Sequence, residues 1–133
     1  MDMNRMTIKL QEALQSASAL AMRRGHQGID VEHLLLALME QEGGIAGSLF
    51  EQAGVSPAAV RQAAEQALTK VAQVHGPGAA PGQIHLTPRL GSLLTKAEDR
   101  MKELRDEFVS VEHIILAMVE EGGIFRRLNL THE

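Results

Sequence analysis

The chain has 133 residues, enough for one domain with a substantial core, and a formal net charge of −4 from 13 basic and 17 acidic residues. That balance lacks the basic patch of a nucleic-acid-binding protein, and the absence of cysteine excludes disulfides, thiol nucleophiles and thiolate metal sites. No segment has the roughly 20 apolar residues that span a bilayer, and the N-terminus has no secretory signal. We therefore expect a cytoplasmic protein that contacts neither nucleic acid nor membrane.

Hydrophobic residues make up 44% of the chain, but aromatic residues only 2%. The core must therefore consist of Leu, Ile, Val, Ala and Met. These are mostly good helix formers, whereas the aromatic residues that favour strands are scarce. The composition predicts an all-α fold.

Two helices are expected at the start of the chain. Thr7 can cap the first, because its hydroxyl can accept a hydrogen bond from a free backbone N–H, and Gly25 marks its end. Asp30 is the expected cap of a second, leucine-rich helix that ends at Gly43–Gly44. The long leucine run predicts that this second helix is buried on most sides.

Two more helices complete a first repeat of about residues 7–72. A short helix is expected over residues 45–53, and a longer one begins with Ser56 as its cap and Pro57 in its first turn. The glycine and proline density of the following segment, 73–86, predicts a linker.

The second repeat, about residues 87–133, begins with a threonine cap followed by proline. Its first helix is expected from Thr87 to about Arg105, and its second from Ser110 to Gly122–Gly123. A short helix follows. The sequence then stops where a fourth helix would begin, so we expect the last helix of this repeat to be truncated.

The two repeats are related by a shift of eighty positions. Residues 7–41 and 87–121 share ten identities in 35 pairs, whereas unrelated sequences of ordinary composition would share about two. The identities include shared caps and shared spacing, which chance similarity of two amphipathic helices does not explain. We infer a single domain, residues 1–133, that is built by duplication with pseudo-two-fold symmetry.

Two duplicated glutamates are candidate binding residues. Glu32 and Glu112 each lie about two residues inside a helix start. A carboxylate there complements the positive end of the helix dipole, and this explains both residues as well as a binding role does. The histidines that follow, His33 and His113, lack the second histidine of a zinc-protease helix and are interpreted as hydrogen-bonded, partly buried residues.

The threonines and one acid complete the candidate set. A helix N-terminus with a threonine hydroxyl suits a phosphate or a carbonyl oxygen, so Thr7 and Thr87 can bind a ligand or simply cap their helices. Asp106 can be a binding residue or a solvated loop acid. If a threonine of one repeat faces a glutamate of the other, the duplication generates two related sites, but the sequence does not show that arrangement.

Catalytic and DNA-binding functions find little support in the sequence. The glycine-rich "GPGAAPG" lacks the lysine of a phosphate-binding loop, and no serine lies in a nucleophile elbow. A helix-turn-helix interpretation of "RRGHQGIDVEHLL" would place Glu32, Glu40 and Glu42 against the phosphate backbone. We therefore expect no enzymatic activity from this chain.

The paired phrases "IDVEHLLLAL" and "VSVEHIILAM", each preceded by the pattern T-x-x-L-x-x-x-L-x-x-A, resemble the N-terminal domain of Clp-family AAA+ unfoldases. "RRGHQGIDVEHLLLAL" and "LRDEFVSVEH" are most similar to the ClpB-type disaggregases. The resemblance covers essentially the whole chain. It implies an all-α domain of two four-helix repeats that engages unfolded or aggregated polypeptide before an ATPase pore threads it.

The resemblance also suggests site residues and partners. Positions matching Thr7, Asp106 and Glu112 are associated with substrate handling in ClpB-like domains, and Thr7, Thr87, Glu32 and Glu112 resemble the phosphoarginine-binding layout of ClpC-type domains. Adaptor docking or phosphoarginine binding in a ClpC- or ClpA-like unfoldase therefore remains the alternative function. We expect no cofactor in this chain, with ATP and magnesium confined to the ATPase modules. We also expect a monomeric isolated domain and a hexameric full-length protein.

Overall fold

The computed structural model describes residues 3–71 and 85–122. Within them the first repeat contains α1 (Ile8–Arg23), α2 (Val31–Glu40), α3 (Ala46–Gln52) and α4 (Pro57–Leu68), preceded by a short 3-10 helix, Met3–Arg5. The second repeat contains α5 (Pro88–Glu103) and α6 (Val111–Glu121). The all-α prediction is confirmed. The predicted truncation of the last helix and the short helix predicted before it both concern residues outside the described part of the chain.

The helices begin where the sequence predicted their caps. The Thr7 hydroxyl accepts from the Leu10 N–H at 3.3 Å, and the Thr87 hydroxyl accepts from the Leu90 N–H at 3.1 Å. Ser56 caps α4 in the same way. Each side chain satisfies one of the N–H groups that a helix start leaves without a partner.

The core is aliphatic, and the two repeats contribute matching positions to it. Because the apolar residues of α1 and α5 recur every three or four positions, each helix buries one face. In α1 this face consists of Leu10, Ala13, Leu14, Ala17 and Ala21, and in α5 of Leu90, Leu93, Leu94, Ala97 and Met101. Each residue of the first set lies eighty positions before its counterpart in the second.

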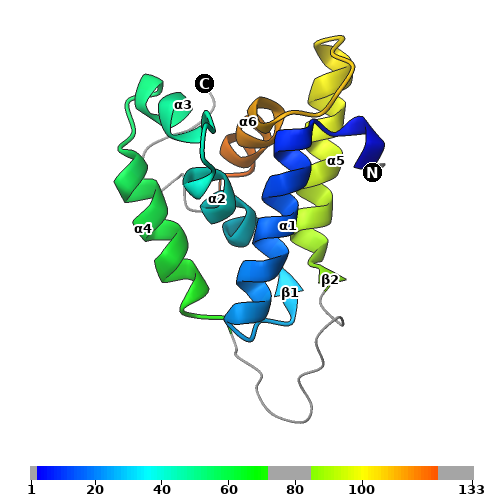
Figure 1. The fold of residues 1–133 in the computed structure, drawn as a ribbon. Helices are drawn as coiled ribbons and strands as arrows, with labels where there is room; N and C mark the ends of the chain where they lie inside the picture. Colours follow the sequence, from blue (N-terminus) through cyan, green and yellow to red (C-terminus); the bar gives the residue numbers. More distant parts are fainter. Residues whose placement is uncertain (1–2, 72–84, 123–133) are drawn as a thin grey trace.

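Helix α2 is the central element of the first repeat. It packs against both α1 and α4, and Figure 1 shows it between them. Every residue from Val31 to Leu38 is buried, including Glu32 and His33. Burial on most sides was predicted from the leucine run. In the second repeat α5 packs against α6 in the way that α1 packs against α2.

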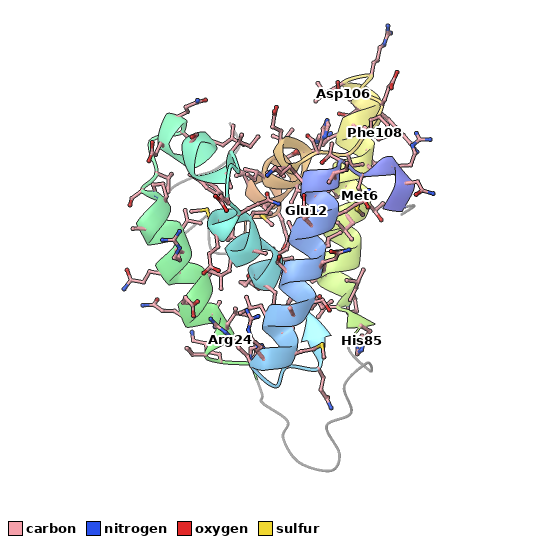
Figure 2. The ribbon with its side chains drawn as sticks, viewed as in Figure 1. Met6, Glu12, Arg24, His85, Asp106 and Phe108 are labelled. Carbon is pink, nitrogen blue, oxygen red and sulfur yellow. The ribbon has the colours of Figure 1, made fainter. Side chains whose placement is uncertain are left out.

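Two short backbone contacts join the repeats. Gly28–Ile29 (β1) pairs in parallel with His85–Leu86 (β2), two residues that the sequence placed in the linker. Met6 forms the corresponding parallel bridge with Val109. The contacts lie at opposite ends of α1: β1 and β2 lie near its lower end in Figure 1, and Met6 lies just before its first turn. Figure 2 shows Met6 well above His85 of β2.

Candidate functional site

Each contact between the repeats brings a helix-capping threonine of one repeat to the start of the second helix of the other. The Thr7 N–H donates to the Val109 carbonyl at 2.9 Å, two residues before α6. The Thr87 N–H donates to the Ile29 carbonyl at 3.1 Å, two residues before α2. The duplication has therefore produced two related environments, in which Thr7 lies near the start of α6 and Thr87 lies near the start of α2.

In the environment at the start of α2, the chain's own side chains bind the acidic residues. The Thr87 hydroxyl donates to Asp30 Oδ1 at 3.0 Å, and Arg89 Nη1 lies 2.8 Å from Glu32 Oε1. Arg89 Nε also lies 2.7 Å from Glu121 Oε1. Glu32 is only 6% exposed. Thr87 and Glu32, both predicted site residues, therefore come together in a closed cluster of hydrogen bonds.

The environment at the start of α6 is open and forms a pocket of about 510 Å³. The lining residues come from the segment between α5 and α6 and from the first half of α6: Leu104, Asp106, Phe108, Ser110, Glu112, His113 and Leu116. The pocket thus brings together two of the predicted residues, Asp106 and Glu112. Thr7 does not line it, although its backbone bonds to Val109, between two lining residues.

The surface of this pocket combines apolar and acidic groups. Leu104 is 59% exposed and Phe108 47% exposed, although solvation of such side chains is unfavourable. Glu112 is exposed and has neither an ion pair nor a hydrogen-bond partner among residues 3–71 and 85–122. In Figure 2, Phe108 and Asp106 lie together at the upper end of the molecule, beyond α5.

A local network holds the turn that carries Asp106. The Ser110 N–H donates to Nδ1 of His113 at 2.9 Å, so the neutral ring carries its proton on Nε2. That Nε2 lies 2.8 Å from Asp106 Oδ2 and can donate to it. The Asp106 N–H in turn donates to the Met101 carbonyl at 3.0 Å. One carboxylate oxygen of Asp106 is therefore used for positioning, and half of its side chain, 51%, stays exposed to a ligand.

At the position that corresponds to Asp106, the first repeat has His26. His33 Nδ1 accepts from the Asp30 N–H at 2.9 Å, and His33 Nε2 lies 2.8 Å from Nδ1 of His26. Burial, reinforced by the neighbouring His26, lowers the pKa of His33 to about 4. The prediction that His33 and His113 are hydrogen-bonded structural residues agrees with these contacts, since both close the cap of their own helix.

The sequence did not single out Arg89, Leu104 or Phe108. A comparison of the repeats offered one signal, because Arg89 and Lys9 both lie two residues after a capping threonine and differ in side chain. Leu104 and Phe108 flank Asp106 in a polar turn, where an exposed aromatic residue is unusual. Their exposure could be established only from the packed structure.

Comparison with known proteins gives the family. The pattern of the family described as "Clp repeat (R) N-terminal domain" matches residues 5–130. The chain belongs to the Clp N-terminal domain family. It is 45% identical over 139 residues to a chaperone protein ClpB of Nitratidesulfovibrio vulgaris, and this similarity covers 100% of the chain. The predicted membership is thereby confirmed, and the Clp N-domain spans only 16% of the length of that relative.

Solved structures confirm the Clp N-domain fold. The Hsp104 N-terminal domain of Candida albicans superposes with a TM-score of 0.80 at 21% identity, over 95% of this chain and 83% of that one. A ClpV N-domain in complex with a VipB peptide superposes with a TM-score of 0.77 at 21% identity, over 96% and 77% of the two chains. At these identities the likeness concerns the fold alone.

The described part of this Clp N-domain shows no group suited to a metal. Among residues 3–71 and 85–122, no three His, Asp or Glu side chains lie close enough together to hold an ion. No described helix is long and apolar enough to cross a membrane.

Proposed function

We propose that this Clp N-domain recognises substrate for a ClpB-like, ATP-dependent disaggregase. It binds unfolded or aggregated polypeptide and passes it to the ATPase pore of the full-length protein. In this proposal the chain itself is non-catalytic and cytoplasmic, needs no cofactor, and is a monomer that becomes part of a hexamer in the full-length protein. Nucleotide and magnesium act in modules outside residues 1–133.

The pocket beside α6 carries this proposal. Its exposed Leu104 and Phe108 suit the apolar side chains that an unfolded chain presents and a folded protein hides. Glu112 and Asp106 suit the N–H groups of an extended backbone or a basic side chain. A shallow pocket that accepts many sequences cannot optimise its contacts for any one of them, so we expect weak binding. Several copies in a ring would add avidity.

Adaptor docking is the second candidate function. The ClpV N-domain of the same fold is described with a bound VipB peptide, which supports a defined peptide segment as a partner. Phosphoarginine is less suited to this pocket. Glu112 could bind the guanidinium group, but among residues 3–71 and 85–122 no lysine or arginine lines the pocket to bind the phosphate, and Asp106 would repel it.

Chemical-shift mapping tests the proposal. The ¹⁵N-labelled domain is titrated with a polypeptide rich in leucine, phenylalanine and arginine, in its unfolded form and in a folded form of the same sequence. We expect saturable shifts around Asp106, Phe108 and Glu112 with the unfolded form alone. Binding of only the folded form would favour an adaptor. The absence of shifts with either form would refute binding at this pocket.

A further inference from the structure

The two repeats place different side chains at one pair of equivalent positions. Arg89 follows the Thr87 cap by two residues, and Lys9 follows the Thr7 cap by two residues. The Arg89 guanidinium reaches across to the first repeat: Nη1 lies 2.8 Å from Glu32 Oε1 and 3.7 Å from Asp30 Oδ1. A carboxylate near the start of α2 therefore binds a guanidinium group from another part of the chain.

Arg89 uses a second edge of its guanidinium group for α6. Its Nε lies 2.7 Å from Glu121 Oε1. Burial alone would lower the pKa of Arg89, but the hydrogen bonds to Glu32 and Glu121 outweigh it and raise the pKa. The planar fork of donors suits two carboxylates at once, which the single ammonium group of a lysine could not bind in the same way. The side chain is still 39% exposed, so solvent reaches the bound group.

In the other environment, no guanidinium group from residues 3–71 or 85–122 forms an ion pair with the corresponding glutamate. Lys9 Nζ donates to the Glu42 carbonyl at 3.0 Å and so turns away from α6. Gln41, the counterpart of Glu121, donates its amide to the Lys9 carbonyl at 2.8 Å. Glu112, the counterpart of Glu32, is exposed and unpaired within the described part of the chain.

We propose that Arg89 is an internal ligand. Its guanidinium group occupies, at Glu32, the first-repeat counterpart of the pocket beside α6, so that the domain offers an external polypeptide one site instead of two. This inference rests on the proposed function for the site that remains open. Because Arg89 occupies one of the two sites, it determines how many sites remain for an external ligand.

A purely structural role for Arg89 predicts a different behaviour. If Arg89 only links α5 to α2 and α6, its removal lowers the stability of the domain and creates no new binding site. An internal ligand leaves behind a cavity lined by Glu32, Glu121 and Asp30 that an external guanidinium compound can fill. The two roles differ in this gain of binding, which loss of stability cannot mimic.

The test uses the full 133-residue chain with Arg89→Ala, ¹⁵N-labelled and titrated with ethylguanidinium chloride. Ethylammonium chloride at the same ionic strength is the control for unspecific salt effects. With ethylguanidinium we expect saturable shifts of the Glu32, Thr87 and Glu121 amides in the variant, and no saturable shift of these three amides in the wild type. A folded variant without saturable shifts would overturn the proposal. Arg89→Met, which keeps the aliphatic stem, takes its place if the alanine variant unfolds.

A second titration counts the sites for an unfolded peptide containing leucine, phenylalanine and arginine. The wild type should show one set of shifts, at the pocket beside α6, and Arg89→Ala a second set around Glu32. A second set already present in the wild type would contradict closure by Arg89. If the wild type binds no peptide, the proposed function fails, yet the ethylguanidinium titration still decides the role of Arg89.

Discussion

His26 Nδ1 lies 2.8 Å from Nε2 of His33, at the place where Asp106 meets His113 in the second repeat. His33 must keep its proton on Nε2, because its Nδ1 accepts from the Asp30 N–H. His26 therefore accepts through Nδ1 and carries its own proton on Nε2, which is buried and has no partner among the described residues. The first repeat thus holds a neutral pair where the second holds an acid and a base.

This pair should make folding sensitive to acid. The pKa of His33 is about 4 in the folded protein and 6.5 in an ordinary histidine, so the unfolded state binds more protons between these values. This contribution to the free energy of unfolding should therefore be fully present above about pH 6.5. It should fall by up to about 3 kcal/mol as the pH drops towards 4. Urea unfolding measured across this range checks the prediction.

His26→Gln provides the matched comparison for the acid effect. The glutamine oxygen can still accept from His33 Nε2. Burial still lowers the pKa of His33, but the second basic ring is gone, and with it the additional lowering that His26 causes. The loss of stability between pH 6.5 and 4 should be smaller in this variant. If the free energy of unfolding of the wild type did not change between pH 6.5 and 4, the His26–His33 pair would not be buried as described.

The turns after α1 and α5 predict opposite effects of glycine. Gly25 has φ 71°, and Arg105, its counterpart eighty positions later, has φ 61°. This left-handed conformation is strained for a residue with a Cβ, by about 1 kcal/mol. Arg105→Gly should therefore raise the free energy of unfolding by about that amount, and Gly25→Ala should lower it similarly. Chemical denaturation of both variants is the measurement, and a destabilised Arg105→Gly would contradict the assignment of this turn.

A close contact beside Thr87 predicts which glycine tolerates alanine. A Cβ on Gly28 would lie 2.9 Å from Thr87 Cγ2, so the contact between β1 and β2 would have to shift. We expect Gly28→Ala to cost about 1–3 kcal/mol. Gly91→Ala, inside α5, is the control, because its Cβ would meet no atom of residues 3–71 or 85–122 within 4 Å. This substitution should stabilise the domain by about 0.5–1 kcal/mol. Equal effects on the thermal midpoint would argue against this packing.

The two capping threonines should differ in their effect on stability. Replacing either threonine with alanine removes a helix cap and should lower the free energy of unfolding by about 1 kcal/mol. Thr87→Ala also leaves Asp30 without the hydroxyl at 3.0 Å, a hydrogen bond to a charged group. Thr87→Ala should therefore destabilise the domain more than Thr7→Ala does. Urea denaturation at neutral pH checks the order, and the reverse order would count against the hydrogen bond to Asp30.

Much of the fold could be predicted from local patterns. The threonine and serine caps at Thr7, Ser56 and Thr87, and the glycine after α1, act on their own helix and therefore appear in the sequence. The pairing of β1 with β2 could not be predicted in this way. It involves two residues on each side and depends on the docking of the repeats, which no local propensity encodes.

The candidate site was less predictable for the same reason. Glu32 and Glu112 are the same residue at the same position of two similar helices, yet one is buried against Arg89 and the other is exposed. Arg89 lies 57 positions from Glu32 in the chain. The difference arises from contacts across the domain. The role of the predicted residues in binding stays a prediction.

The affinity of one unfolded peptide for three variants tests the central claim most directly. Fluorescence anisotropy with a labelled peptide of leucine, phenylalanine and arginine gives the dissociation constants. Phe108→Ala should weaken binding about tenfold through loss of an aromatic contact, and Glu112→Gln a few-fold, on the order of an exposed charge pair. Glu32→Gln, the same change in the closed environment, should leave the affinity within about twofold. Peptide binding that is unchanged by Phe108→Ala and Glu112→Gln would contradict the assignment of the pocket beside α6.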